Sequence, residues 1–163
     1  MAGESPSGPV VPKWEYLIAH HAPHRYGRTL PLGIGRRVYH FCARCTGQAL
    51  GFFALLSVFA IRPSFEATAA TPAVALILGV CPAAAMADWL TQAVRSRESN
   101  NPLRLASGAL LGVAGGGLVA YGLFQDGWLF ASGLAVLGLY LGLASMALHR
   151  SGSMRRVVAD HFP

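Results

Sequence analysis

The sequence is poor in charged residues, and above all in acidic ones. Its 163 residues include seven Asp and Glu against thirteen Lys and Arg, and charged residues make up 12% of the chain. This share is about half of that in an average soluble domain. A soluble core built from a chain that is 53% hydrophobic would need far more charged surface to cover it. The composition therefore excludes an ordinary soluble globular domain and favours a membrane protein.

Cysteine is also scarce, and no secretory signal is visible. Two of the three cysteines lie in Cys42-Ala-Arg-Cys45, and this number and spacing do not suggest the disulfide framework of a small secreted protein. Residues 1–12 contain no apolar run, so we expect no cleavable signal peptide there. The same residues are rich in Gly, Ser and Pro, and we expect them to form a disordered tail.

Long hydrophobic runs, in contrast, are abundant. A bilayer core about 30 Å thick is crossed by roughly 20 apolar residues in a helix. Four stretches meet this requirement, the first of them slightly short: residues 46–61, 72–90, 103–124 and 128–148. The sequence therefore predicts an all-α membrane protein, a four-transmembrane-helix bundle over residues 46–148 with a cytosolic N-terminal loop region.

The basic residues are distributed unevenly between the segments that connect the predicted spans. Six precede the first span, three lie between the second and third, three follow the fourth, and only Arg62 falls in a loop on the other side. Because basic loops stay in the cytosol, we expect a multi-pass protein of the inner (plasma) membrane with both termini cytoplasmic. Anionic inner-leaflet lipids would then surround these charges, which explains the basic pI without nucleic acid as a partner.

Two cytosolic segments flank the predicted bundle. Residues 13–45 are expected to form a cytosolic or interfacial segment that holds most of the histidines and the cysteine pair, and residues 149–163 a cytosolic tail. Within the first segment, residues 22–41 contain five helix-breaking residues, so we expect a loop there. These five are Pro23, Gly27, Pro31, Gly33 and Gly35.

Small residues recur at helical spacing in the predicted spans. Lipid tails are as apolar as leucine, so close contact between small residues is what holds such helices together. The third span offers Gly108, Gly112 and Gly116 at four-residue spacing, and the fourth offers Gly138 and Gly142. We interpret all of these glycines as packing residues.

Polar residues gather at the cytosolic ends of the second and third spans. Asp88 and Gln92 are four residues apart and therefore share a helix face. Arg104 shares a face with the glycines of the third span, and we expect it to point inward toward Asp88, because charges at membrane depth usually have a partner in the bundle interior. In Asn101-Pro102, the asparagine is expected to cap the third span, which places Arg104 in the first turn.

A cation in the first turn of a helix is disfavoured by the helix dipole and needs a negative neighbour. Asp88, Glu98 or a bound anion could supply it. Free N–H groups at the helix start, together with an arginine fork, are typical of an anion site. We therefore predict a site for an anionic lipid or isoprenoid phosphate, while a structural Asp88–Arg104 ion pair remains the alternative. The predicted ligand-binding residues are Asp88, Gln92, Asn100, Asn101 and Arg104.

The cysteine pair is the second candidate site. Two thiolates with one or two imidazoles suit tetrahedral zinc, so we predict zinc as a cofactor. Two alternatives stay open: a redox pair, in which Arg44 and the helix N-terminus favour the thiolate, and free reduced thiols at the bilayer interface. The predicted metal ligands are Cys42, Cys45, His20, His21 and His24, and His40 also precedes the pair.

Several runs of the sequence resemble a known family. They are Phe41-Cys-Ala-Arg-Cys-Thr-Gly47, Asp88-x-x-x-Gln92, Glu98-Ser-Asn-Asn-Pro-Leu-Arg104 and Ser107-Gly108. Together they resemble, over about residues 20–116, the small prokaryotic membrane proteins catalogued as domain of unknown function 2085. The resemblance implies a polytopic prokaryotic membrane protein of undetermined activity. In that family a Cys-His pair precedes the CxxC; His20 stands in place of the Cys here, an exchange that a zinc ligand tolerates.

Taken together, these features favour a zinc-stabilised cytosolic-face site that binds an anionic lipid or isoprenoid phosphate. The alternatives are a small transporter or channel lined by Asp88 and Arg104, a membrane-embedded enzyme acting on lipid phosphates, and a thiol-redox membrane protein. Transport would need matching polar residues in the third and fourth spans, and an enzyme would need more than Asp88 and Glu98 as acids. Binding is therefore the preferred interpretation.

Overall fold

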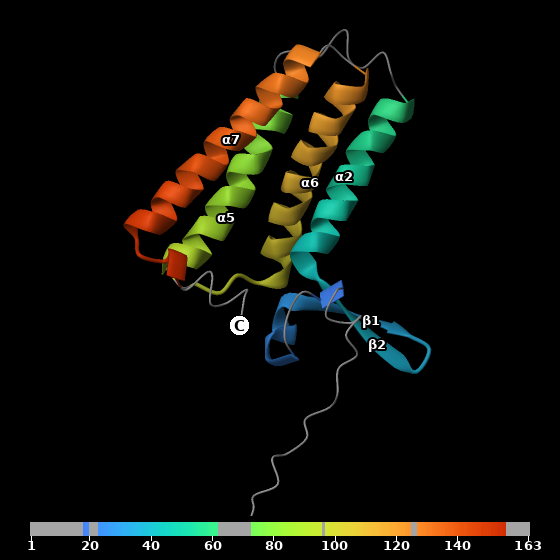
Figure 1. Cartoon of the computed structure of the whole chain (residues 1–163). Helices are drawn as coiled ribbons and strands as arrows, with labels where there is room; N and C mark the ends of the chain where they lie inside the picture. Colours follow the sequence, from blue (N-terminus) through green and yellow to red (C-terminus); the bar gives the residue numbers. More distant parts are fainter. Residues whose placement is uncertain (1–17, 20–22, 62–72, 96, 125–126, 156–163) are drawn as a thin grey trace, which may run out of the picture.

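A computed structural model describes residues 18–19, 23–61, 73–95, 97–124 and 127–155 of the chain. Its main body is a bundle of four long helices, whose arrangement Figure 1 shows. The stretches long and apolar enough to cross a membrane are Ala43–Ile61, Ala75–Arg95, Asn101–Leu123 and Trp128–Arg150. This confirms the prediction of four transmembrane helices. The helices are α2 (Ala43–Ile61), α5 (Cys81–Arg95), α6 (Asn101–Phe124) and α7 (Gly127–Arg150), with the π-helical η2 (Ala75–Val80) directly before α5.

The π-helical segment η2 has a local cause in the sequence. Pro82 has no backbone N–H and its ring clashes with the carbonyl four residues earlier, so a regular α-helix cannot continue through it. The chain widens instead: the N–H of Cys81 donates to the carbonyl of Leu76, five residues back. The Tyr140 hydroxyl of α7 donates to the Gly79 carbonyl at 2.6 Å, which satisfies a backbone acceptor within this irregular turn.

Helices α2 and α6 approach each other through glycines on both sides. A Cβ atom added to Gly47 or Gly51 of α2 would collide with the backbone of α6, and one added to Gly108 or Gly112 would collide with the backbone of α2. The glycine stripe of the third span is therefore a packing surface, and α2 is its partner. Interfaces of small residues let helix backbones come this close in lipid.

Two glycines of α7, Gly138 and Gly142, do not lie at the helix contact that their spacing predicted. An added Cβ at Gly138 or Gly142 would meet no other atom within 4 Å, so neither glycine lies at a helix contact within the described part of the chain. The packing interpretation was wrong for these two residues. Spacing alone could not distinguish them from the α6 stripe, because it does not reveal which face of a helix has a neighbour.

The segment before the bundle contains a β-hairpin. A 3₁₀ turn, η1 (Pro23–Arg28), leads into β1 (Thr29–Ile34), which pairs antiparallel with β2 (Arg37–Cys42). Gly35 begins the connecting turn with φ +62°, a left-handed conformation that glycine adopts without a steric penalty. The loop expected over residues 22–41 is therefore replaced largely by a 3₁₀ turn and paired strands. The end of β2, Cys42, is followed immediately by the first residue of α2.

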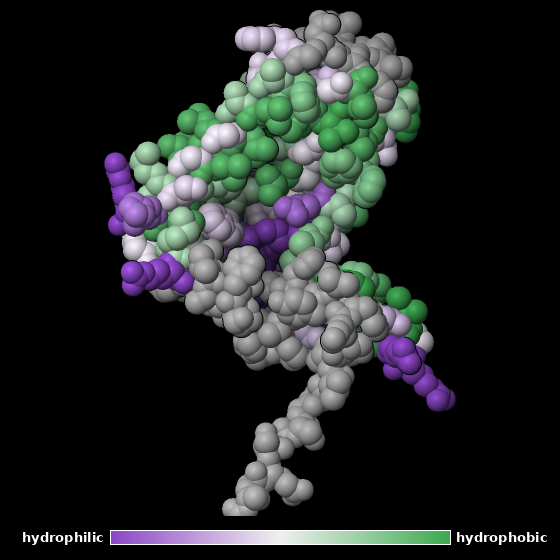
Figure 2. All heavy atoms as spheres, viewed as in Figure 1, coloured by the Kyte–Doolittle hydropathy of each residue, from purple (hydrophilic) through white to green (hydrophobic). Residues whose placement is uncertain are grey.

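All four helices have one end on the side of the hairpin. The starts of α2 and α6 and the ends of α5 and α7 lie there, and we refer to this side as the hairpin end (Figure 1). Figure 2 shows hydrophilic side chains gathered at this end, beneath a belt of hydrophobic side chains that covers the helices. At the opposite end, an apolar core forms around Phe59, Ile77, Leu78 and Tyr121. Polar chemistry is thus confined to one end of the bundle in this view.

Candidate functional site

Asp88 is the central acidic residue of the hairpin end. It lies in α5, and its side chain is only 5% exposed. Arg44 of α2 donates to its Oδ2 at 2.8 Å, and Arg97, from the connection between α5 and α6, donates to its Oδ1 at 3.1 Å. The Ser107 hydroxyl of α6 donates to Oδ2 at 3.1 Å. The carboxylate therefore joins three other segments of the chain and pairs with two guanidinium groups.

Arg104 is the most buried cation of the site, with 5% of its surface exposed. Its Nε donates to the Ser99 carbonyl at 3.0 Å, and its Nη2 donates to Oε1 of Gln92 at 3.1 Å. Among the described residues, the ion pairs of Asp88 are with Arg44 and Arg97, not with Arg104. The expected direct Asp88–Arg104 pair is therefore not formed, although Arg104 does point into the same cluster through Gln92.

The start of α6 differs by one residue from the expectation. Asn100, not Asn101, is the N-cap: its Oδ1 accepts from the N–H of Leu103 at 2.9 Å, and its carbonyl accepts from the N–H of Arg104 at 3.0 Å. Asn101 instead donates through Nδ2 to the Thr29 carbonyl at the start of β1. The predicted Asn100 amide is thus engaged as a cap, and Asn101 attaches the hairpin to the bundle.

A fourth arginine completes the cluster. Arg28, which ends η1, donates to Oε1 of Glu98 at 2.9 Å, while the Glu98 side chain is 80% exposed. Arg28 and Arg44 lie within electrostatic range of the Arg104 guanidinium, as does Asp88. We refer to Arg28, Arg44, Arg97 and Arg104 as the arginine cluster. Only two carboxylates, Asp88 and Glu98, face these four cations. The group therefore carries a net charge of +2.

Sequence reasoning missed three members of this cluster. Arg28 had been counted only among the basic residues before the first span. Arg44 had been considered for its effect on the neighbouring thiols, and Arg97 only as one of the basic residues of a loop. One feature of the sequence did indicate that Asp88 pairs with more than one arginine. The arginines that follow Asp88 in the sequence outnumber the two carboxylates there, Asp88 and Glu98. Which arginine reaches Asp88 depends on the α2–α6 contact, which the sequence does not specify.

The cysteine pair lies beside this cluster at the start of α2. Cys42 is buried, Cys45 is exposed, and a side-chain hydrogen bond links the two thiols. The predicted ligands His20 and His21, and the His24 side chain, lie outside the described residues. His40 contacts Thr29 through Nδ1 at 3.0 Å and stacks on Tyr26. Within the described residues no group of three His, Cys, Asp or Glu side chains is arranged to hold a metal ion.

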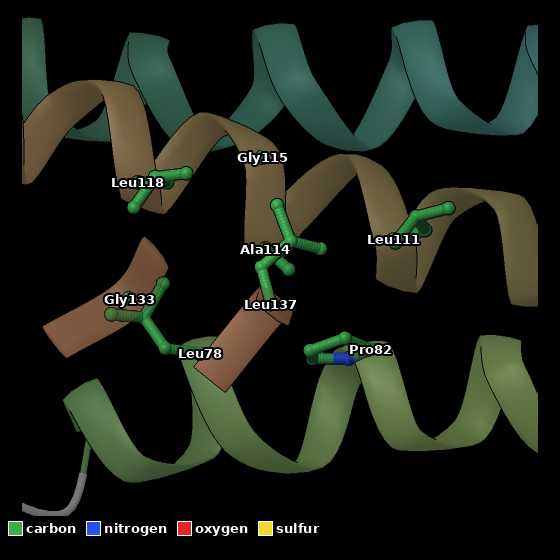
Figure 3. Close-up of a pocket in the computed structure, with 8 residues that line it drawn as sticks. All are labelled: Leu78, Pro82, Leu111, Ala114, Gly115, Leu118, Gly133 and Leu137. Atoms are coloured by element: carbon green, nitrogen blue, oxygen red, sulfur yellow. The ribbon is translucent and has the colours of Figure 1, made fainter. Parts of the chain in front are cut away.

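An apolar groove lies further along the bundle. It has a cavity volume of about 200 Å³ and is formed between η2, α5, α6 and α7. Figure 3 shows its lining, in which Leu111 of α6 and Pro82 of α5 mark the end nearer to the arginine cluster. Leu111 follows Arg104 by seven residues, two helical turns or about 10 Å along the same face of α6. The groove lining is Leu78, Pro82, Leu111, Ala114, Gly115, Leu118, Gly133 and Leu137.

The fold and the site define a class: a polytopic membrane protein of four helices with a buried arginine–aspartate cluster at one end. Residues 27–118 match the family model described as "Predicted membrane protein (DUF2085)". Because this match covers more than half of the chain, the protein belongs to that family. A protein of Methanothermobacter thermautotrophicus, named "Uncharacterized protein", is 35% identical over 96 residues, which are 59% of this chain and 78% of the relative. No solved structure matches the chain.

Proposed function

We propose that the arginine cluster binds the phosphate of an anionic membrane lipid, either a phospholipid or an isoprenoid phosphate. The observation that carries this proposal is the excess of buried or half-buried cations: four arginines face two carboxylates, and the most buried one, Arg104, has no carboxylate partner among the described residues. Taking charges out of water is costly unless they are compensated. A bound anion would supply the missing compensation.

The geometry of the guanidinium groups supports phosphate as that anion. Each guanidinium has five N–H donors in a planar fork that matches phosphate oxygens. Arg44 and Arg97 each contact Asp88 through Nη2, and Arg104 uses Nε and Nη2. In the part of the chain that the structure describes, the Nη1 groups of these three arginines have no hydrogen-bond acceptor, so they remain for an incoming ligand.

Two features favour a lipid over a soluble anion. The cluster lies at the ends of membrane-spanning helices, which is the depth of lipid headgroups. The apolar groove begins about two turns from Arg104 on the same face of α6, so a hydrocarbon chain could continue into it from a phosphate held by the cluster. The groove lining in Figure 3 carries no charged side chain.

The test is native mass spectrometry of the full chain released from nanodiscs of mixed phosphatidylglycerol and phosphatidylcholine. We expect wild type to retain phosphatidylglycerol preferentially and Arg104→Gln to lose that preference. Arg95→Gln is the matched control, because it removes the same charge from an exposed position at the end of α5. Equal retention of both lipids by wild type, or an unchanged preference in Arg104→Gln, would contradict the proposal.

A second measurement distinguishes the source of the phosphate. Inorganic phosphate and a long-chain lipid phosphate are compared as ligands that raise the unfolding temperature of the detergent-solubilised protein. A lipid site predicts a shift with the lipid phosphate alone. A site for free phosphate predicts equal shifts with both ligands.

Zinc remains a second part of the proposal. The hydrogen-bonded Cys42 and Cys45 thiols supply two adjacent sulfur donors beside the arginine cluster, and zinc would hold the preceding segment against the bundle if histidines completed its coordination. The same thiol contact also supports the thiol-redox alternative. For a lipid-phosphate enzyme the support is weaker, because Asp88 is already engaged by two arginines and Ser107.

A further inference from the structure

The β1–β2 hairpin presents an apolar face whose outer part, at Leu32 and Ile34, is exposed in the described part of the chain. Side chains alternate across a two-stranded sheet, so Leu30, Leu32 and Ile34 of β1 share one face. Their cross-strand partners Phe41, Tyr39 and Arg37 lie on that face too, with Arg37 opposite Ile34 at the tip. Leu32 is 50% exposed and Ile34 is 58% exposed.

The opposite face of the hairpin is the one attached to the bundle. It holds Thr29, Gly33 and His40; Thr29 is 1% exposed and its hydroxyl contacts the Tyr26 carbonyl and His40. The Asn101 side chain donates to the Thr29 carbonyl, which fixes this end of β1 on α6. Pro31, Val38 and Cys42 are the apolar residues of this face; Cys42 is buried, and Val38 is 57% exposed near the tip.

The position of the hairpin brings it to the depth of lipid headgroups. Cys42 ends β2 and the membrane-spanning helix α2 begins at the next residue, so no linker separates the strand from the bilayer. Figure 1 shows the hairpin projecting sideways beyond the footprint of α2 instead of folding under the centre of the bundle. Lipid that surrounds the four helices would meet it there.

The hairpin combines exposed apolar side chains with neighbouring basic residues, the combination expected at the interface of an anionic membrane. Arg36 lies in the turn between the strands and Arg37 is the first residue of β2; both are exposed. Basic residues near an anionic leaflet contribute about 1 kcal/mol each. In Figure 2 the hydrophobic side chains of the hairpin cover its side toward the level of the helices, and hydrophilic side chains project at the tip on the other side.

From this arrangement we propose that the β1–β2 hairpin is an interfacial membrane anchor. Its face of Leu30, Leu32 and Ile34 rests among the lipids of the leaflet at the hairpin end, and Arg36 and Arg37 contact anionic headgroups. The anchor holds η1 and Arg28 beside the start of α6, through the Arg28–Glu98 and Thr29–Asn101 contacts. The inference concerns a surface separate from the arginine cluster and does not depend on what that cluster binds.

The test is photo-crosslinking of the full chain in nanodiscs of phosphatidylglycerol and phosphatidylcholine. Benzoylphenylalanine replaces Leu32, Gly33 or Ile34 in three separate variants, and lipid adducts are measured by intact mass. We expect adducts from positions 32 and 34 and few from position 33. Position 33 is a matched control, because an added Cβ there meets no atom within 4 Å and its side chain points to the other face.

The outcomes separate a lipid surface from other occupants. Equal and low lipid adducts at the three positions would overturn the proposal, and so would crosslinks from positions 32 and 34 to a second copy of the chain. A second measurement uses Arg36→Gln combined with Arg37→Gln. We expect this double variant to reduce adducts at position 34 in phosphatidylglycerol nanodiscs and to leave them unchanged in pure phosphatidylcholine; equal adducts in both lipids with and without the arginines would remove the charge part of the proposal.

Discussion

Arg44 and Asp88 lie 44 residues apart in the sequence, and the Arg44 Nη2 donates to Asp88 Oδ2 at 2.8 Å. The contact connects the first turn of α2 to the middle of α5, two helices that flank α6. The Ser107 hydroxyl of α6 binds the same carboxylate oxygen at 3.1 Å. One buried carboxylate thus links three of the four spans.

Asp88→Asn is expected to destabilise the bundle. The amide keeps the size of the side chain but leaves Arg44 and Arg97 without their carboxylate, and removing one partner of a buried ion pair costs about 3–5 kcal/mol. Because Arg97 is 45% exposed, we expect the lower end, about 3 kcal/mol. The measurement is the free energy of unfolding in mixed micelles titrated with SDS.

Glu98→Gln is the control for this prediction. It also removes a carboxylate from an arginine, but the Glu98 side chain is 80% exposed, and exposed pairs contribute about 0–1 kcal/mol. Equal losses of stability in the Asp88 and Glu98 variants would contradict a structural role that is specific to Asp88.

The membrane-spanning helices could be predicted from the sequence because each depends on a long local run of apolar residues. The Asp88–Gln92 face could be predicted for the same reason: four-residue spacing places both side chains on one side of a helix. The partner of Asp88 could not be predicted. Arg44, Arg97 and Arg104 are equivalent cations in a linear sequence, and only the close α2–α6 contact brings Arg44 within reach.

The hairpin was missed because its local signals conflict. The alternation of Leu30, Leu32 and Ile34 is typical of a strand, but Pro31 and Gly33 are both disfavoured in strand interiors. Both strands of a two-stranded hairpin are edge strands. Proline is tolerated in edge strands, so Pro31 can lie in β1. The attachment of Thr29 to Asn101 adds support that lies 72 residues away in the sequence.

Gly112→Ala is expected to weaken the α2–α6 contact. The added methyl group would collide with the backbone carbonyl of Gln48, which cannot move aside as a flexible side chain could. Overpacking of this kind costs about 1–3 kcal/mol. Gly138→Ala is the matched control, because its methyl group would meet no atom within 4 Å. Alanine also has a helix propensity about 1 kcal/mol better than glycine, so Gly138→Ala should be neutral or stabilising. Unfolding free energies that move in parallel for the two variants would contradict this assignment.

Zinc binding at the cysteine pair predicts a metal content that depends on both thiols. We expect zinc in the purified wild type and its loss in the Cys42→Ser/Cys45→Ser double variant, because serine does not replace a thiolate as a zinc ligand. The measurement is inductively coupled plasma mass spectrometry of the detergent-solubilised protein. Cys81→Ser is the control, since Cys81 is a buried cysteine in the second span, at the start of α5, and should leave the zinc content unchanged. Zinc that is absent from wild type, or equal in both variants, would exclude this site.

Tyr140→Phe tests the connection between α7 and the irregular turn of the second span. The Tyr140 hydroxyl donates to the Gly79 carbonyl at 2.6 Å, and the variant leaves this acceptor without that partner. Hydrogen bonds between membrane helices contribute about 0.6 kcal/mol on average and at most about 1.7 kcal/mol, so we expect a loss of about 1 kcal/mol in unfolding free energy.

The same hydrogen bond should be energetically coupled to Pro82. In Pro82→Ala the restored N–H can donate to the Leu78 carbonyl four residues earlier, so the helix can close to regular α geometry. In that geometry the Gly79 carbonyl accepts from the N–H of Ala83 in its own helix. Tyr140→Phe should then cost less in the Pro82→Ala background than in wild type, which a double-mutant cycle of unfolding free energies measures. Strict additivity of the two substitutions would mean that Tyr140 stabilises α7 independently of the π-helical turn.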